Sequence, residues 1–354
     1  MTRITIILLA LFLDLAWGDP PNRFHPLLLM GRWLSWGRRL APPCRRFWFG
    51  ASWTLAGMAL FALPFWKLEK RTNCRLQAAS CKLQFTTPAP LALPIGARVS
   101  MRSSATIHHS PFTIHYSQFI LHPFLLKPVF AYRNLRRAVG EVGRALAADD
   151  LSEARRLLSW HLVSRDTGQL SAAEVAGAAI ESLAENLTDS LTAPLLAYAI
   201  GGLPVAWAYR FVNTADAMWG YRTTEFEQLG KFPARLDDGL NWLPARITGW
   251  LLVAAAWLAG EDGRNAARTM LAQHNRTASL NAGWTMSAMA GALGVTLNKR
   301  DVYELAGGAA AADADAIWRA LRVADICIGL NVILLIAASL IQAVKPWSRD
   351  RNHF

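Results

Sequence analysis

Five apolar stretches divide the chain, with polar or charged segments between them. They cover residues 4–17, 47–66, 191–209, 247–260 and 326–344. The second, third and fifth stretches have the roughly 20 residues that a helix needs to cross a hydrocarbon core of about 30 Å. The other two are shorter, and a sixth candidate at 282–297 is rich in small residues that let helices approach closely. The pattern therefore predicts an all-α, polytopic integral membrane protein.

The third apolar stretch is interrupted at its centre by Gly201-Gly202-Leu203-Pro204, a strong break for a helix. The chain can cross there as a kinked helix, or it can turn back as a re-entrant hairpin. Only the hairpin places the polar segments before and after the break in one compartment. Upstream, residues 127–190 have the amphipathic periodicity of helices and are expected in the cytosol.

Two segments depart from this pattern. The loop 18–46 holds six arginines against one aspartate, which predicts a cytoplasmic location. Residues 67–123 show no helical or strand periodicity, and this composition predicts a disordered insertion. A local reading-frame error in the gene would also produce a segment with this composition and no periodicity. The expected organisation is N-terminal membrane helices with a basic loop at 1–66, the insertion at 67–123, a helical membrane and catalytic region at 124–344, and a tail at 345–354.

Charge and composition exclude some classes of function, among them nucleic-acid binding. The 354 residues include 37 Lys and Arg against 25 Asp and Glu, a net charge of +12, yet only 18% are charged and 53% are hydrophobic. The loop 18–46 and the segment 67–123, which has seven basic residues against one acidic residue, hold nearly all of this excess. The partner indicated is therefore the lipid bilayer and not a nucleic acid. The common nucleotide-loop, zincin and hydrolase motifs are absent from the sequence.

Three carboxylates recur at helical spacing where an apolar run begins. Glu181, Glu185 and Asp189 fall at about 0°, 40° and 80° around a helix, so they share one face. Like charges in a low dielectric repel unless a cation joins them, and Mg²⁺ with bound phosphates would supply that cation. The alternative is a solvated face that pairs with Arg165 or a neighbouring loop.

A second polar constellation follows the third apolar stretch. Its arginines, carboxylates and amides suit recognition of phosphate or carboxylate groups, although a salt-bridged interfacial loop would have the same composition. The members are Asn213, Asp216, Arg222, Arg235, Asp237, Asp238, Asn241, Trp242 and Arg246.

Several long motifs follow one another along the chain. They are Leu13-Asp14-Leu-Ala-Trp-Gly18-Asp19-Pro20-Pro21 with His25-Pro26, Ser164-Arg165-Asp166-Thr167, Ala178-Ala-Ile-Glu181-Ser-Leu-Ala-Glu185-Asn186, Tyr209-Arg210-Phe-Val-Asn213-Thr-Ala-Asp216 with Gly220-Tyr221-Arg222, Arg235-Leu236-Asp237-Asp238 with Asn241-Trp-Leu-Pro244-Ala-Arg246, and Asn281-Ala-Gly283-Trp284. In this order they resemble the CbiB/CobD family of cobalamin biosynthesis. The match covers most of 1–63 and 124–344, and the departure is the segment 67–123.

The resemblance implies a multi-pass enzyme of the cytoplasmic membrane with its active site facing the cytosol, an adenosylcobinamide-phosphate synthase. Such an enzyme joins adenosylcobyric acid to an aminoalcohol phosphate, such as aminopropanol phosphate, while consuming ATP with Mg²⁺. Other cobalamin-assembly enzymes would be further partners.

On this interpretation, each group of site residues has an expected role. Glu181, Glu185 and Asp189 would hold the metal. Asp237, Asp238 and Asp166 are the catalytic candidates. The substrate and phosphate contacts would come from Arg165, Asn213, Asp216, Arg222, Arg235, Asn241, Arg246 and Trp242.

Two other classes compete with the ligase. A membrane sensor similar to AmpE would not need the full set of carboxylates and arginines. A transporter is compatible with a broken helix, but the sequence shows no inverted repeat.

Overall fold

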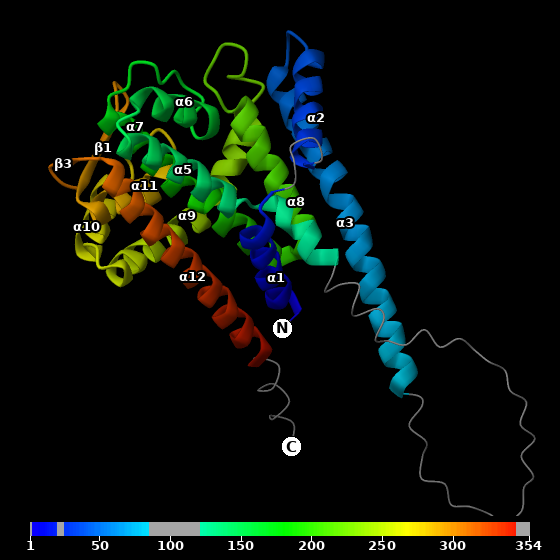
Figure 1. Cartoon of the computed structure of the whole chain (residues 1–354). Helices are drawn as coiled ribbons and strands as arrows, with labels where there is room; N and C mark the ends of the chain where they lie inside the picture. Colours follow the sequence, from blue (N-terminus) through cyan, green and yellow to red (C-terminus); the bar gives the residue numbers. More distant parts are fainter. Residues whose placement is uncertain (1, 20–24, 85–120, 345–354) are drawn as a thin grey trace, which may run out of the picture.

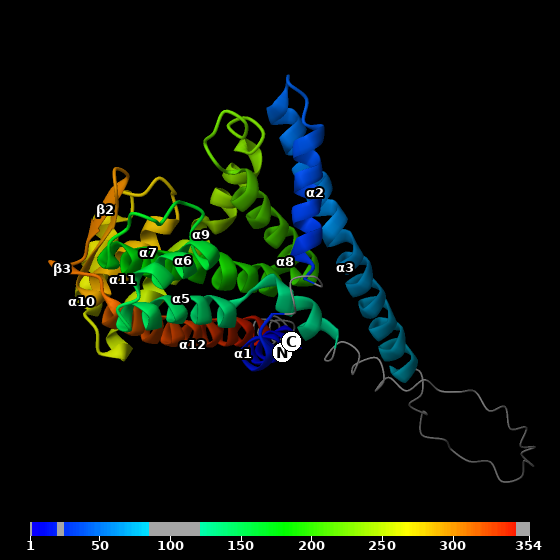
Figure 2. The same cartoon turned by 45° about the horizontal axis from the view of Figure 1, so that its top comes forward.

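The computed structural model describes residues 2–19, 25–84 and 121–344, and it is almost entirely helical, which confirms the all-α class. Figures 1 and 2 show α5, α7 and α12 packed side by side, with α2 and α3 lying along α8. The helices are α1 Thr2–Trp17, α2 Leu27–Leu40, α3 Arg46–Gln84, α5 Tyr132–Ala147, α6 Leu151–His161, α7 Ala172–Leu187, α8 Ala193–Trp219, α9 Lys231–Ala259, α10 Gly263–Gln273, α11 Ala282–Leu293 and α12 Ala314–Val344, with a 3₁₀ turn η2 at Lys127–Val129 and a π-helical turn η3 at Thr188–Thr192.

Four helical segments among the described residues are long and apolar enough to cross a membrane: Arg46–Arg71, Ala172–Trp219, Lys231–Ala259 and Ala314–Ile341. These segments make the chain a membrane protein and agree with the second, third, fourth and fifth apolar stretches. The prediction of a further crossing at 282–297 is wrong. Gly294 adopts a left-handed conformation that ends α11, and a strand follows.

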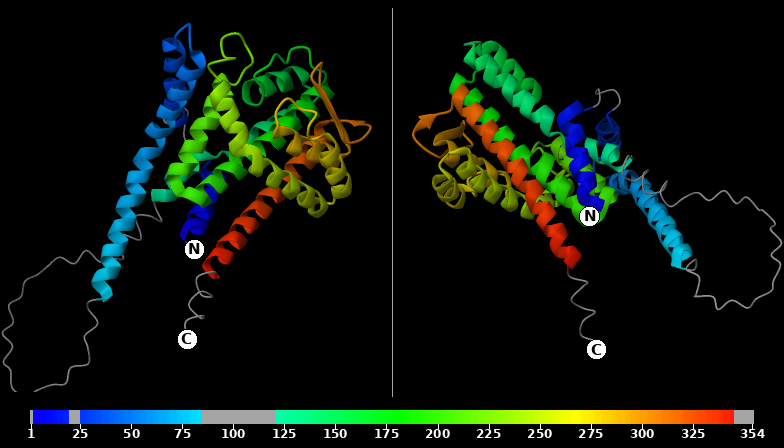
Figure 3. Two further views of the ribbon diagram at one scale, coloured as in Figure 1. Left: turned by 180° about the vertical axis from the view of Figure 1, so that it is seen from behind. Right: turned by 60° about the horizontal axis from the view of Figure 1, so that its bottom comes forward.

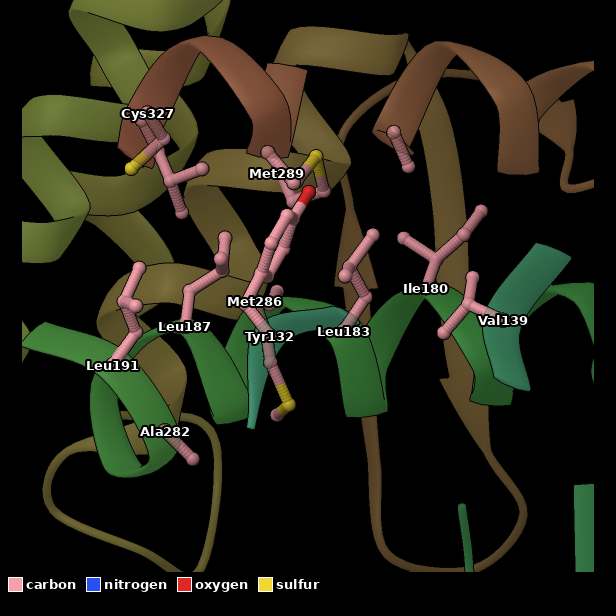
Figure 4. Close-up of a cluster of buried hydrophobic side chains, with 14 of the residues drawn as sticks. Tyr132, Val139, Ile180, Leu183, Leu187, Leu191, Ala282, Met286, Met289 and Cys327 are labelled. Atoms are coloured by element: carbon pink, nitrogen blue, oxygen red, sulfur yellow. The ribbon is translucent and has the colours of Figure 1, made fainter. Parts of the chain in front are cut away.

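α11 is instead a core helix. Nearly all of its residues are buried, and Figure 4 shows Met289 close to Leu183 and Leu187 of α7 and to Cys327 of α12. The expected close approach of small residues is present here, because a Cβ on Gly283 would clash with the backbone of His274, the residue directly after α10. This packing buries the apolar face of α7.

A small sheet, not predicted from the sequence, follows α11. Its strands are β1 Val295–Lys299, β2 Tyr303–Ala306 and β3 Ala310–Ala311, in the order β2-β1-β3. The first two strands pair antiparallel, with Lys299 opposite Tyr303. The register places these two side chains together beside α7.

The chain reverses direction inside α8. Gly202 has φ 70° and ψ −159°, which splits α8 into two helical segments. Tyr209 donates a hydrogen bond from Oη to the carbonyl oxygen of Asp189 at 3.1 Å. In a straight helix two residues 20 positions apart would be about 30 Å apart, so the chain folds back, as the green ribbon shows in Figure 3. The hairpin alternative is therefore the geometry present.

Side chains from elsewhere satisfy the backbone groups that this break frees. Arg3 donates from Nη1 to the carbonyl oxygens of Ala199 and Ile200, both at 2.8 Å. Glu69 accepts from the backbone N–H of Leu203 at 2.8 Å. A cation thus faces the carboxyl end of the first segment and an anion the amino end of the second, the signs that helix dipoles favour.

The predicted boundary at 66/67 lies inside α3. α3 continues through Gln84, and residues 121–126 are also helical, so a disordered insertion does not begin at Lys67 or extend to Pro123. The far end of α3 projects away from the other helices in Figures 1 and 3, and a helix in such a position does not require an apolar stripe in its sequence. Residues 85–120, and the predicted tail at 345–354, lie outside the described residues.

We expect Glu69→Leu to lower the stability of the protein. The substitution leaves the Leu203 N–H without its acceptor, which costs about 1 to 3 kcal/mol. The thermal midpoint of the purified protein in detergent should fall by several degrees. Arg71→Met, on an exposed position of the same helix, is the matched control. Equal midpoints for the two variants would show that Glu69 does not support the break.

Candidate functional site

A polar cavity of about 520 Å³ lies where η3, α8 and α9 converge. Its wall contains five carboxylates and two cations, contributed from both sides of the break at Gly202. The charged and amide residues that line it are Glu185, Asp189, Asp216, Arg222, Asp237, Asp238, Asn241, Asn281 and Lys299. The fold thus brings together most of the two constellations that the sequence predicted separately.

Asp237 is the most precisely held acid in this cavity. Its side chain accepts hydrogen bonds from Nδ2 of Asn241 at 2.9 Å and from Nδ2 of Asn213 at 3.5 Å. Tyr209 donates to Oδ1 of Asn241 at 2.9 Å, which fixes the orientation of the Asn241 amide. Only 7% of Asp237 is exposed. Two helices therefore position this carboxylate, as expected for a residue that binds a cation or a reacting group.

The cavity has an excess of negative charge. Asp189 and Asp237 come from different helices, and the charges of Asp216 and Asp238 add to the repulsion. A bound cation would offset it. The described residues contain no group of three or more His, Cys, Asp or Glu side chains arranged to hold a metal. Mg²⁺ requires only one or two carboxylates when substrate phosphates and water complete its shell, so the residues present fit Mg²⁺ bound together with phosphate.

A smaller cavity of about 210 Å³ adjoins the first, and Glu185 and Lys299 line both. Glu181 lines only the smaller cavity and Asp189 only the larger one. The three carboxylates predicted to form one metal site are therefore divided between two neighbouring spaces. The π-helical turn η3, which begins directly after α7, offsets Asp189 from the regular helical spacing.

Five predicted site residues line neither cavity: Asp166, Asn213, Arg235, Trp242 and Arg246. Asp166 is exposed and accepts a hydrogen bond from the backbone N–H of Gly168 at 2.9 Å, a turn-stabilising arrangement. Arg235 is on the exposed face of α9. Arg246 stacks between Trp242 and Trp284, 4.1 and 4.8 Å from their ring centroids. These aromatic rings form a separate surface, connected to the larger cavity by the contact of Arg246 Nη1 with Asn281 Oδ1 at 3.5 Å.

Lys299 and Tyr303 line the cavities but were not predicted as site residues from the sequence. The capping box of Ser171 and Glu174 starts α7, and Arg300 pairs with Glu174, which holds the β1–β2 turn against that helix. Lys299 is the neighbouring residue. Burial and the carboxylates of Glu181 and Glu185 raise the pKa of Tyr303, so its hydroxyl stays protonated. No local motif marks these positions, because they reach the site only through the strand register.

Asp14 and Asp19, from the first of the family motifs, belong to a separate polar cluster near the N-terminus. Lys127 pairs with both Asp14, at 3.0 Å, and Asp19, and Asn134 donates to Asp19 Oδ2 at 2.6 Å. Although burial opposes it, hydrogen bonds from His25 and Lys127 keep the pKa of Asp19 below its usual value. This cluster joins α1 to η2 and α5 and lies outside the two polar cavities described above.

Comparison with known proteins shows the family to which the chain belongs. The family profile described as CobD/Cbib protein matches residues 7–332. The "Probable cobalamin biosynthesis protein CobD" of Methanothermobacter thermautotrophicus is 37% identical over 346 residues, which cover 98% of this chain and 100% of that protein. The "Cobalamin biosynthesis protein CobD" of Dehalococcoides mccartyi is 36% identical over 86% of this chain and 87% of its own.

A further relative, the "Cobalamin biosynthesis protein CobD" of Geobacter metallireducens, is 47% identical over 173 residues, which cover 49% of this chain and 54% of that protein. No solved structure matches the chain significantly. The profile match spans nearly the whole chain and includes every residue that lines the two polar cavities. The chain therefore belongs to the CobD/CbiB family of cobalamin biosynthesis proteins.

Proposed function

We propose that this protein is an adenosylcobinamide-phosphate synthase, which forms an amide between adenosylcobyric acid and an aminoalcohol phosphate at the expense of ATP. The observation that carries the proposal is the convergence of five carboxylates, Arg222 and Lys299 on one cavity. Activation of a carboxylate by phosphoryl transfer requires a cation and positive side chains around the transferred group. A cavity with this composition meets both requirements.

Within the larger cavity, we assign Asp189 and Asp237 to Mg²⁺ that carries the ATP phosphates, with phosphate oxygens and water completing its shell. Arg222 and Lys299 would neutralise charge on the phosphoryl group during transfer. Asp238 is partly exposed at the wall and would contact the incoming substrate. The bound metal supplies charge neutralisation, while the protein contributes alignment through the amides that hold Asp237.

The corrin requires a flat apolar surface beside this cavity. Trp242, which is 53% exposed, and the neighbouring Arg246 and Trp284 provide one next to Asn281. Stacking on aromatic rings suits a macrocycle, and Arg246 would face its carboxamide and carboxylate groups. We assign this surface to adenosylcobyric acid.

ATP is cytosolic, so we place the cavity on the cytosolic side of the cytoplasmic membrane. The reversal at Gly202 supports this placement, because it returns Asp216 to the side on which Glu185 lies. A straight crossing helix would separate the two by the thickness of the bilayer.

Membranes that contain this protein should form the amide product when given adenosylcobyric acid, aminopropanol phosphate and Mg²⁺-ATP. Detection of the condensed corrinoid by mass spectrometry is the measurement. Membranes from the same host without the protein, and reactions that lack ATP or Mg²⁺, are the controls. An intact preparation that binds corrinoid but makes no amide under these conditions would contradict the proposed activity.

A further inference from the structure

The smaller cavity has a charge pattern that differs from that of the larger one. Its charged lining consists of Arg165 and Lys299 on one hand and Glu181 and Glu185 on the other, so the two signs balance. Hydroxyl groups of Ser164, Ser182 and Tyr303 and the amide of Asn186 complete the polar wall. A balanced wall favours a ligand that carries both charges at once.

Glu181 indicates that a ligand belongs here. Its side chain is only 6% exposed, and its Oε1 atom has no hydrogen-bond partner among the described residues. A buried carboxylate oxygen left unpaired costs about 1 to 3 kcal/mol or more. A donor from a bound molecule would offset that cost, and Glu181 faces the cavity that would hold it.

The size of the cavity limits the ligand. At about 210 Å³ it is smaller than the roughly 300 to 1,000 Å³ of pockets that hold drug-sized molecules. Neither a nucleotide nor a corrin fits that volume. A three-carbon molecule with a phosphate at one end and an ammonium group at the other matches both the volume and the paired charges.

We propose, on the basis of the function proposed above, that the smaller cavity is the binding site of the aminoalcohol phosphate. The phosphate lies on Arg165 and Lys299, with the hydroxyl of Tyr303 as a further donor. The ammonium group faces Glu181 and Glu185. These assignments give Lys299 and Tyr303, which no sequence motif marks, a direct role in substrate recognition.

The wall shared by the two cavities orients the reaction. Glu185 lines both spaces, so the nitrogen beside it points toward the corrin carboxyl group that ATP has activated as an acyl phosphate. Glu185 accepts one proton from the ammonium group, and the nitrogen lone pair forms the bond to the carbonyl carbon. The bond from that carbon to the phosphate oxygen breaks, and the phosphate leaves with the electron pair and takes the second proton from nitrogen.

The test uses purified full-length protein in detergent and the Michaelis constants of all three substrates. Lys299→Met and Arg165→Met should each raise the KM of aminopropanol phosphate at least tenfold and change that of adenosylcobyric acid less than threefold. For Arg165→Met, which lies outside the larger cavity, the KM of ATP should also change less than threefold. Arg268→Met, an exposed position on α10, is the matched control and should leave all three constants unchanged.

Glu181→Gln tests the ammonium side separately. This variant should bind aminopropanol phosphate at least tenfold more weakly, and propyl phosphate, which lacks the amine, with unchanged affinity. Calorimetric titration without ATP or corrinoid measures both. An Arg165→Met protein with an unchanged KM for aminopropanol phosphate and a raised KM for ATP would overturn this inference and leave the proposed function standing. A different result would contradict the proposed function: the wild-type protein binds aminopropanol phosphate, Lys299→Met weakens that binding, and yet the wild-type protein forms no amide.

Discussion

Replacing Asp237 by Asn lowers the rate of amide formation by about 100- to 10,000-fold. Asp237 is buried, accepts hydrogen bonds from two amides and faces the carboxylates of Asp189 and Asp216 across the larger cavity. Loss of its charge weakens the binding of the cation that holds the ATP phosphates. The effect should appear in kcat and as a higher Mg²⁺ concentration for half-maximal rate.

The fold should survive this substitution. An asparagine at 237 leaves one of the two donors from Asn213 and Asn241 unpaired, which costs about 1 to 3 kcal/mol. A thermal midpoint lowered by only a few degrees would separate this structural cost from the catalytic one. Asp315→Asn, an exposed carboxylate near the start of α12, is the matched control. Turnover of Asp237→Asn within threefold of wild type would show that Asp237 has no role in the reaction.

Gly202→Val should prevent the protein from folding to its native state. The residue has φ 70° and ψ −159°, a region that is open almost only to glycine, and a Cβ there would clash with the carboxylate of Glu69. Backbone strain and overpacking together cost about 2 to 6 kcal/mol, which is comparable to the whole stability of a typical domain. We expect loss of the monodisperse peak in size-exclusion chromatography of the detergent extract.

Gly239→Ala is the control for this experiment. Gly239 lies in α9, and a Cβ added there meets no atom within 4 Å. Alanine at this helical position should be neutral or should raise stability by up to about 1 kcal/mol. If Gly202→Val folded and retained activity like Gly239→Ala, the chain would not need to reverse at that point, and the larger cavity would require another explanation.

Much of the site could be predicted because charged residues are costly inside an apolar run. Glu185 and Asp189 stand out for that reason, and so do Asp237 and Asn241 in the next apolar helix. Helical periodicity placed Glu185 and Asp189 on one face, but the π-helical turn η3 offsets Asp189 from that spacing. Asp166 and Arg235 were assigned to the same site only because of the motifs around them. Both side chains are exposed to solvent.

The end of α3 could not be predicted from the sequence, which indicated a boundary at residue 66. The sequence of α3 beyond Trp66 has no apolar periodicity, yet the helix continues. One contact that it makes there joins Glu69 to Leu203, two residues far apart in the chain. A pairwise contact of this kind leaves no periodic signal.

The sequence by itself determined that the protein is helical and membrane-embedded, and it marked most of the acidic and amide residues that line the larger cavity. These properties follow from local composition and spacing, which act within a few helical turns. The tertiary structure alone decided that the chain reverses at Gly202, that Lys299 and Tyr303 join the carboxylates of α7, and that the site consists of two cavities with a common wall. Each of these depends on contacts between distant segments, whose energies come from packing and hydrogen bonding in three dimensions.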